Sequence, residues 1–236
     1  MQDQQAALDW QDGRTPVSRQ FDDPYFSVDD GLAETAHVFL AGNDLPARFG
    51  GDVRIAELGF GTGLNFLVTW AAWLHAGGPG RLSFTTFEAF PMAPADQARA
   101  LAAFPELASL AGQMLDALAM GPGPSALGPN LTLQIIHGDA RQTLSQWEGM
   151  ADAWFLDGFS PAKHPEMWGE GLLADVARHT NPGGTAATYT AAGHVRRALT
   201  AAGFAVTRQP GYGRKRHMTT ARIPSRCATI PGLASG

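Results

Sequence analysis

The sequence predicts an α/β protein with a mostly parallel, doubly wound sheet. From Val53 onward, short apolar runs of strand length alternate with longer segments of helical spacing. This alternation favours parallel strands joined by right-handed crossovers. Near the end of the chain, the runs 204–209 and 218–223 are separated only by PGYGRKRH. That gap is too short for a crossover helix, so we expect the last two strands to form an antiparallel hairpin.

The first strand and the first helix flank a glycine-rich turn. VRIAEL (53–58) is a β-branched apolar run that ends at glycines. GLNFLVTWAAWL (63–74) is apolar on all sides, which is typical of a buried helix, and GGPG ends it. The later elements follow in this order: strand 81–90, Ala-rich helices within 92–120, loop 121–130, strand 131–140, short helix 139–147, strand 151–159, helix 170–180 ended by NPGG, strand 185–191 and helix 194–203.

Three regions divide the chain. Residues 53–223 carry the alternating pattern and are expected to form one domain. Residues 1–52 do not follow the pattern, so we expect an N-terminal extension of loops and a small hairpin that packs on this domain. Residues 224–236 are expected to form a C-terminal tail.

The composition favours a soluble, cytoplasmic protein. Of the 236 residues, 44% are hydrophobic, which suffices for a sizeable core, and no apolar run reaches the roughly 18 residues that span a bilayer. Cys227 is the single cysteine, so an internal disulfide is excluded and a reducing compartment fits. Residues 1–10 are polar and acidic, unlike a signal peptide. The net charge of −5 argues against a generally basic nucleic-acid coat but permits a local basic patch.

The glycine turn AELGFGTGLNF (56–66) is a candidate ligand-binding loop. Its spacing fails the dinucleotide pattern G-x-G-x-x-G, and it lacks the G-K-[ST] of a phosphate-binding loop. It matches E-x-G-x-G-x-G, the first loop of class I S-adenosylmethionine methyltransferases, with Glu57 leading the glycines. A carboxylate there can hold the ammonium group of the ligand, and bare backbone can lie against its ribose and amino-acid tail. The alternative is a glycine turn that serves packing only.

Acidic residues also end the next strands. Glu88 ends the second strand, where a carboxylate can accept hydrogen bonds from both ribose hydroxyls, and Asp139 follows the third, where it can accept from the adenine amino group. Asp139 alternatively suits the N-cap of the helix after it. Ligands of open α/β sheets bind at the carboxyl ends of the strands. The candidate cofactor-binding residues are Glu57, Gly59, Phe60, Gly61, Gly63, Asn65, Glu88, Asp139, Ala140 and Asp157.

Asp157, at the end of the fourth strand, is the candidate catalytic residue. Methyl transfer is an in-line displacement, so the acceptor must present a lone pair along the bond from sulfur to carbon. An amine acceptor is mostly protonated in water, and a carboxylate can orient its N–H bonds and take up or relay a proton. The same carboxylate stabilises the ammonium form, so orientation and charge stabilisation count as much as basicity. Alternatively, Asp157 caps a turn of the following loop.

Five segments closely resemble the methyltransferase half of the bifunctional tRNA-modifying enzyme MnmC, which also occurs alone as MnmD: residues 15–49, AELGFGTGLNFL (56–67), DAWFLDGFSPAKHPEMW (152–168), GHVRRALTAAGF (193–204) and GYGRKRHM (211–218). The resemblance implies a Rossmann-like class I methyltransferase fold. It implies methyl transfer from S-adenosylmethionine to the 5-aminomethyl nitrogen of the wobble (2-thio)uridine, leaving S-adenosylhomocysteine, with Asp157 as the catalytic residue. Nothing in the chain resembles the companion FAD-dependent oxidase, so we expect no FAD here. Either a separate oxidase acts upstream, or the chain is one domain of a longer protein.

The expected partner is the anticodon loop of tRNA. Basic residues for phosphate contacts lie in the turn before the last strand, in the helix 194–203 and beyond Asp157. Aromatic residues can stack on an unstacked base. The candidates are Phe159, Lys163, Trp168, Arg196, Arg197, Tyr212, Arg214, Lys215 and Arg216. The alternatives are a solvated basic hairpin and aromatics buried in the core.

Other functions remain open or disfavoured. An aminopropyltransferase, or another small-amine N-methyltransferase, would use a similar fold and a similar aspartate. A non-catalytic tRNA-binding domain is a second alternative, against which the acidic residues count. The glycine spacing disfavours a nicotinamide oxidoreductase, and neither a zinc pattern nor G-x-S-x-G is present, so we expect no metal. We expect a monomer.

Overall fold

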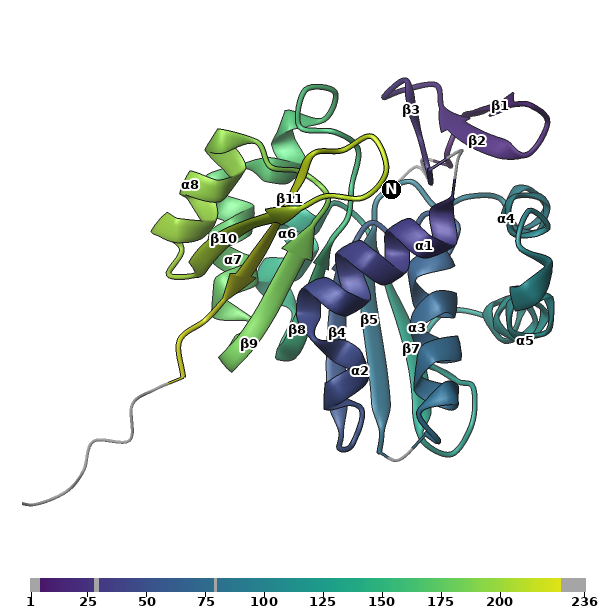
Figure 1. Cartoon of the computed structure of the whole chain (residues 1–236). Coiled ribbons are helices and arrows are strands. Elements are labelled where there is room, and N and C mark those ends of the chain that lie inside the picture. Colours follow the sequence, from purple (N-terminus) through teal and green to yellow (C-terminus); the bar gives the residue numbers. More distant parts are fainter. Residues whose placement is uncertain (1–4, 28–29, 79, 226–236) are drawn as a thin grey trace, which may run out of the picture.

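The computed structural model describes residues 5–27, 30–78 and 80–225, and its centre is an eight-stranded sheet (Figure 1). The strand order is β10-β11-β9-β8-β4-β5-β7-β6. The strands, in chain order, are β4 (Val53–Leu58), β5 (Leu82–Glu88), β6 (Ser125–Ala126), β7 (Leu131–His137), β8 (Ala151–Leu156), β9 (Thr180–Thr188), β10 (Ala205–Pro210) and β11 (His217–Arg222).

The five central strands run parallel, and the chain reverses its direction of winding between β4 and β8. From β4 it proceeds outward through β5 to β7, then returns to add β8 and β9 on the other side. The last two strands pair antiparallel with each other, and β11 pairs antiparallel with β9. The predicted doubly wound sheet with a C-terminal hairpin is therefore confirmed. Ligands of such sheets bind beside the point where the winding reverses.

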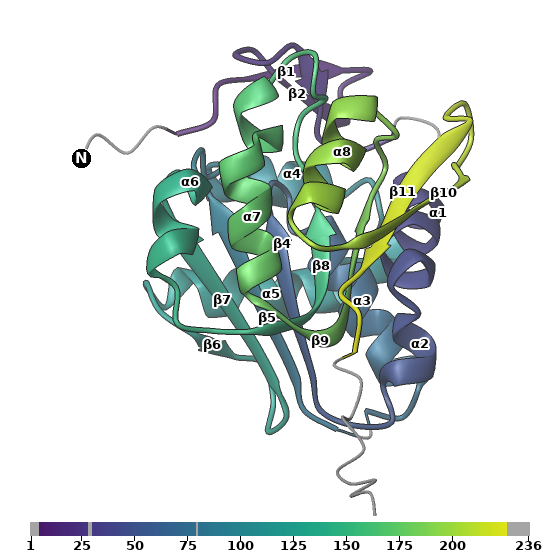
Figure 2. The ribbon, with the colours of Figure 1, turned by 90° about the vertical axis from the view of Figure 1, so that its left-hand side faces the viewer.

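Helices cover both faces of the sheet (Figure 1 and Figure 2). The helices of the main domain are α3 (Leu64–His75), α4 (Pro94–Leu101), α5 (Ala108–Ala119), α6 (Ala140–Thr143), α7 (Glu170–Arg178) and α8 (Gly193–Ala201), with 3-10 turns at Pro105–Leu107, Leu144–Gln146 and Pro165–Trp168. Alternate side chains of β4 enter different cores, because a strand points successive residues to opposite faces. Ile55 packs with α3 and α5, and Ala56 packs with α7 and α8.

Three local predictions were wrong. The motif NPGG does not end a helix but lies inside β9, which starts at Thr180. The predicted loop 121–130 contains β6, a two-residue strand that pairs antiparallel with β7. The predicted strand 131–140 ends at His137, because Gly138 adopts a positive φ of 126° and Asp139 is the N-cap of the next helix.

The N-terminal region is more regular than its sequence indicated. It begins with a small antiparallel sheet of β1 (Leu8–Gln11), β2 (Thr15–Ser18) and β3 (Asp23–Pro24). A helical run then follows instead of loops: α1 (Gly31–Thr35), a π-helical turn Ala36–Leu40, a 3-10 turn Ala41–Asn43 and α2 (Leu45–Arg48). Gly42 and Pro46 are typical of turns, so the sequence predicted loops where the structure has this helical run. A Cβ on Gly42 would come within 2.9 Å of Ala187 and Met218, so this position needs a small residue to pack on the main sheet.

The small sheet lies at the end of the molecule where the parallel strands finish, above the loops that follow them (Figure 1 and Figure 2). Along the described ranges, the structure contains no helix with the length and apolar character to cross a membrane. Most of the predicted C-terminal tail, and Cys227 with it, lies outside the described residues.

Candidate functional site

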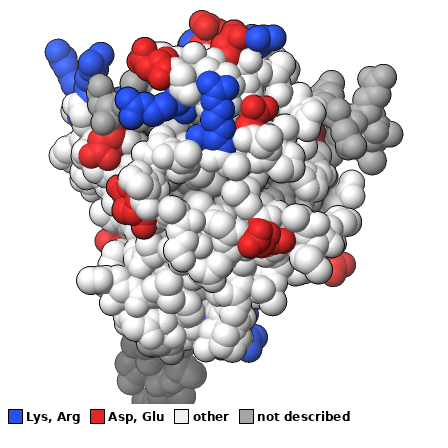
Figure 3. Space-filling view, turned by 90° about the vertical axis from the view of Figure 1, so that its right-hand side faces the viewer, with Lys and Arg blue, Asp and Glu red and all other residues white. Residues whose placement is uncertain are grey.

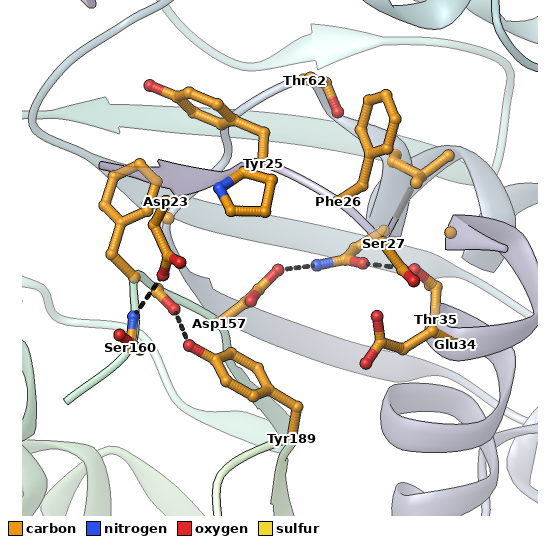
Figure 4. A pocket seen from close by; sticks show the side chains of 18 of the residues that line it. Asp23, Tyr25, Phe26, Ser27, Glu34, Thr35, Thr62, Asp157, Ser160 and Tyr189 are labelled. Atoms are coloured by element: carbon orange, nitrogen blue, oxygen red, sulfur yellow. Dashed lines mark hydrogen bonds between the residues drawn. The ribbon is translucent and has the colours of Figure 1, made fainter. Parts of the chain in front are cut away.

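A cavity of about 560 Å³ opens at the carboxyl ends of β4, β5 and β8. Its floor is the glycine loop after β4 together with the residues that end β5 and β8. Its other walls come from the segment around β3, from α1 and from the turn between β10 and β11. Figure 4 shows Asp157, Glu34 and Tyr189 around the same space, with Tyr25 and Phe26 on the opposite side.

Positive backbone φ angles shape the glycine loop. Gly59 has φ +88°, and a Cβ built there would lie 2.8 Å from the carbonyl oxygen of Asp157. Gly61 has φ +53°, and its Cβ would lie 3.0 Å from the ring of Tyr25. Both glycines line the cavity, as do Phe60 and Asn65, whereas Gly63 forms the N-cap of α3 and does not. Glycine is therefore required where the loop passes the end of β8.

Glu88 is held rigidly at the cavity wall. Its Oε2 accepts a hydrogen bond from the backbone N–H of Gly61 at 2.8 Å, and its Oε1 accepts one from the N–H of Phe90 at 2.7 Å. The side chain is buried, yet it lines the cavity. Each oxygen of a carboxylate has a second acceptor position. Glu88 can therefore receive further hydrogen bonds from a ligand without moving.

Asn65 connects the two other acidic residues of the floor. Its Nδ2 donates to Glu57 Oε1 at 2.8 Å and to Asp157 Oδ2 at 2.7 Å. Its Oδ1 accepts from the hydroxyl of Thr35 at 2.9 Å, which ties α1 to the same network. Glu57 is fully buried beneath Asn65 and does not line the cavity, whereas Asp157 does. One amide therefore holds a deep carboxylate and a cavity carboxylate in a fixed relation.

The environment raises the pKa of both carboxyl groups. Burial is the main cause for Glu57, and the nearby charge of Asp157 raises its pKa further. Burial also raises the pKa of Asp157 to about 6, although the hydrogen bond from Asn65 opposes the shift. Like charges and poor solvation both disfavour the ionised form of an acid. Asp157 is thus a carboxylate that changes protonation close to neutral pH, where a proton acceptor is most useful.

Asp139 is a helix N-cap, which was the alternative to its predicted role in binding adenine. Its side chain caps α6, accepting from the backbone N–H of Arg141 at 2.9 Å, and it pairs with the guanidinium of Arg141 at 2.5 Å. This hydrogen bonding holds the pKa of Asp139 below its usual value. Asp139 does not line the cavity, but the adjacent Ala140 does.

The loop after Asp157 is braced by aromatic contacts. Phe159 lines the cavity, stacks on Phe21 with ring centroids 4.7 Å apart and meets the edge of Tyr25 at 5.2 Å. Trp168 was a stacking candidate, but it is buried in the core and donates from Nε1 to the carbonyl of Phe159 at 2.9 Å. Trp168 thus supports the loop from beneath instead of facing the cavity.

The basic candidates separate into two groups. Tyr212, Arg214 and Lys215 line the cavity from the β10–β11 turn. The others do not line it: Arg216, Lys163, and Arg196 and Arg197 on α8. Lys163 pairs with Asp22 and Asp23 at 3.4 and 3.5 Å and so fastens the loop after β8 to the small sheet.

Sequence reasoning assigned no role to several residues that line the cavity: Asp23, Tyr25, Glu34, Thr35 and Tyr189. Asp23 Oδ2 accepts from the backbone N–H of Ser160 at 2.8 Å, and the hydroxyl of Tyr189 donates to the carbonyl of Gly158 at 2.6 Å (Figure 4). The stretch DDPYF (22–26) lies within residues 15–49, and its aromatic and acidic residues were the available signal. Within the described part of the chain, no group of three His, Cys, Asp or Glu residues is arranged to hold a metal ion.

Comparisons of sequence match the chain to methyltransferases. A family model described as S-adenosyl-L-methionine-dependent methyltransferase matches residues 108–224. The chain is 49% identical over 225 residues to the tRNA 5-methylaminomethyl-2-thiouridine biosynthesis bifunctional protein MnmC of Pseudomonas paraeruginosa, covering 91% of this chain and 34% of that protein. The MnmC protein of Marinobacter nauticus is 46% identical over 233 residues, with coverages of 93% and 37%. The chain therefore spans about a third of the length of these relatives.

Solved structures show the same fold. The crystal structure of MNMC2 from Aquifex aeolicus matches with a TM-score of 0.77 and 26% identity, covering 94% of this chain and 72% of that one. A precorrin-6y C5,15-methyltransferase from Geobacter metallireducens matches with a TM-score of 0.52 and 13% identity, covering 89% and 94%. The second likeness concerns the fold alone.

Proposed function

We propose that this chain, which matches the S-adenosyl-L-methionine-dependent methyltransferase family and is a relative of the MnmC proteins, methylates an amine on tRNA. The acceptor is the 5-aminomethyl nitrogen of the wobble (2-thio)uridine, and the product is 5-methylaminomethyl-(2-thio)uridine. The name of the MnmC relatives supports this choice, because it describes the biosynthesis of that nucleoside in tRNA. The observation that carries the proposal is the Asp157–Asn65 hydrogen bond at the cavity floor. It fixes in place a carboxylate of raised pKa that can contact the acceptor amine.

The cavity fits S-adenosylmethionine. Its volume of about 560 Å³ suits a nucleoside-sized ligand. Gly59 and Gly61 leave bare backbone where a side chain would collide with Asp157 or Tyr25. In this proposal Glu88 accepts hydrogen bonds from the ribose hydroxyls and Ala140 contacts the adenine; both residues line the cavity. Glu57 acts through Asn65, since it does not reach the cavity itself.

Asp157 performs the central step of the proposed reaction. It accepts a hydrogen bond from the acceptor N–H and so directs the nitrogen lone pair toward the methyl carbon. The bound donor supplies an electrophilic methyl group on a sulfonium. As the new carbon–nitrogen bond forms, the carbon–sulfur bond breaks and its electron pair stays on sulfur. The surplus proton on nitrogen then passes to Asp157 or to water. A positioned proton acceptor of this kind contributes roughly 10²- to 10⁴-fold in rate.

The surface for tRNA in this proposal is the rim around the cavity. Tyr212 and Arg214 reach this rim from the β10–β11 turn, and Phe159 lines it from the loop after β8. On the face in Figure 3, basic and acidic side chains gather toward the end that carries the small sheet, while most of the remaining face is uncharged. Backbone phosphates of the anticodon loop would supply affinity, and the aromatic rings would contact the unstacked base.

Nucleoside analysis tests the function directly. The protein is incubated with S-adenosylmethionine and tRNA that carries 5-aminomethyl-2-thiouridine, and the digested nucleosides are identified by mass spectrometry. We expect conversion to 5-methylaminomethyl-2-thiouridine, with no methylation of a matched tRNA that lacks the aminomethyl group. Methylation of free small amines, with tRNA unchanged, would replace this proposal with the small-amine alternative. The proposal includes an FAD-dependent oxidase that supplies the amine. Adding such an enzyme to carboxymethylaminomethyl tRNA, together with this protein and S-adenosylmethionine, should yield the same methylated nucleoside.

A further inference from the structure

An ion pair crosses the cavity wall beside Asp157. Lys215 Nζ lies 2.7 Å from Glu34 Oε1, joining the β10–β11 turn to α1. The same ammonium lies 4.0 Å from the centroid of the Tyr189 ring. The side chain of Glu34 is only 15% exposed, and that of Lys215 is 46% exposed. Lys215 therefore turns into the cavity wall, although sequence reasoning assigned it to tRNA phosphates.

The pair lies within electrostatic reach of the catalytic carboxylate. Tyr189 carries Lys215 on its ring face and donates its hydroxyl to the carbonyl of Gly158, the residue next to Asp157. Burial is the main cause of the raised pKa of Asp157, but Lys215 lowers that pKa and Glu34 raises it. The two members of one ion pair thus shift the pKa of Asp157 in opposite directions.

A second carboxylate near the acceptor would hinder methyl transfer. An amine reacts through its neutral form, and every uncompensated negative charge nearby favours the unreactive ammonium ion. Asp157 is needed for orientation, but Glu34 offers an additional negative charge on the same cavity. With Lys215 bound to it, Glu34 contributes little net charge.

We propose that Lys215 is a positioning residue that neutralises Glu34, so that Glu34 does not hold the acceptor amine as ammonium. The proposal rests on the proposed amine acceptor and names how the site keeps that amine reactive. The same balance governs the preference of the site for a sulfonium over the neutral thioether product.

Other ionisable groups face this part of the cavity, and variants must leave them intact. The charges that act on Asp157 or Tyr189 come from different elements: Asp23 in β3, Glu34 in α1 and Lys215 in the β10–β11 turn. Asp157 in turn raises the pKa of Glu57 in β4. The further titratable residues that line the cavity are Tyr25, Glu88, His164, Tyr212 and Arg214. The variants that test the pair change none of these further residues, so a shift between variants is attributable to the pair.

The test compares Glu34→Gln, Lys215→Met, the double variant and Lys215→Arg with the wild-type chain. The rate of a single methyl-transfer turnover is measured against pH with saturating enzyme and aminomethyl tRNA, which reports groups in the bound complex. Glu34→Gln should move the acid limb to lower pH and Lys215→Met to higher pH, each by roughly half a pH unit or more. The double variant and Lys215→Arg should stay near wild type.

Calorimetry supplies a readout that needs no acceptor. Lys215→Met should raise, and Glu34→Gln should lower, the affinity for S-adenosylmethionine relative to S-adenosylhomocysteine, each by roughly threefold or more. Shifts of both single variants in the same direction, or no shift in either readout, would overturn the proposal and leave a merely structural salt bridge. If wild-type enzyme fails to methylate the tRNA but the affinity ratio still moves in opposite directions, the acceptor assignment fails and the charge balance stands.

Discussion

Asn65 donates a hydrogen bond to Asp157 across 2.7 Å, and the same amide nitrogen donates to Glu57 at 2.8 Å. Through this residue, a helix that starts at the glycine loop controls the carboxylate at the end of β8. A buried network of this kind is costly to disturb, because each deleted member leaves a partner unsatisfied. Substitutions in this network and its surroundings should therefore have measurable effects on activity, binding and stability.

Asp157→Asn should lower methyl transfer at neutral pH by about 10²-fold or more, because the amide cannot accept the proton. Binding of S-adenosylmethionine should persist, because Glu88 and the glycine loop remain. Radiolabelled methyl transfer and calorimetry measure the two effects. Asp116→Asn, an exposed change on α5, serves as the matched control and should retain full activity. Full activity of Asp157→Asn would remove Asp157 from the mechanism.

The same substitution should stabilise the fold above pH 6. The pKa of Asp157 is raised in the native state to about 6, so the native state holds a proton that the unfolded state releases at lower pH. This group therefore favours folding below its unfolded pKa, and its contribution is lost as pH rises toward 6. Asp157→Asn removes this pH-dependent loss. It should raise the free energy of unfolding by on the order of 1–3 kcal/mol at pH 7 but change it little near pH 4. Denaturant unfolding at both pH values checks the sign, and an equal effect at the two would contradict it.

Asn65→Ala should raise the pKa of Asp157 further, because the hydrogen bond that opposes the shift disappears. The acid limb of the single-turnover rate should therefore move to higher pH. The fold should also lose about 1–3 kcal/mol, since two buried carboxyl oxygens lose a donor. Thr35→Val is the matched control: it removes the bond to Asn65 Oδ1 but leaves both carboxylate bonds. Equal pH profiles for the two variants would show that Asn65 does not tune Asp157.

Gly59→Ala should impair both stability and cofactor binding. A Cβ there lies 2.8 Å from the carbonyl oxygen of Asp157, in addition to the strain of its positive φ. Gly203→Ala isolates the strain, because Gly203 has φ +103° and a Cβ added there would meet no atom within 4 Å. We expect roughly 1 kcal/mol of destabilisation from the control and more from Gly59→Ala. Thermal unfolding and calorimetry with S-adenosylmethionine compare them, and equal losses would show that the contact with Asp157 does not matter.

Replacing Arg214 and Arg216 with Gln should weaken tRNA binding and flatten its salt dependence. Each lost phosphate contact lowers the slope of log affinity against log salt by about 0.7–0.9. The comparison pair is Arg196→Gln with Arg197→Gln on α8, which does not line the cavity. We expect the α8 variants to lose less tRNA affinity than the variants in the β10–β11 turn. A larger loss from the α8 variants would show that tRNA binds elsewhere than at the β10–β11 turn.

Local patterns determined much of the fold and part of the site. The alternation of apolar runs and helical segments after Val53 predicted the doubly wound sheet, because strand and helix periods are properties of neighbouring residues. The hairpin at the C-terminus followed from the short gap between its strands. The glycine loop, Glu88 and Asp157 were found because parallel strands bring their carboxyl ends to one edge. The helical run through α1 and α2 was missed, because Gly42 and Pro46 resemble turn signals.

Only the tertiary structure decided which side chains share the cavity. Asp139 follows β7 closely, much as Glu88 ends β5, yet it turns to Arg141 and caps α6. Glu34 and Lys215, 181 residues apart in the chain, meet beside Tyr189. No sequence spacing encodes such a pair, because its formation depends on how α1 and the β10–β11 turn pack around the sheet. The sequence by itself determined that an acid would stand at the end of the fourth strand; packing decided the burial, the hydrogen bond from Asn65 and the neighbouring charges that set its chemistry.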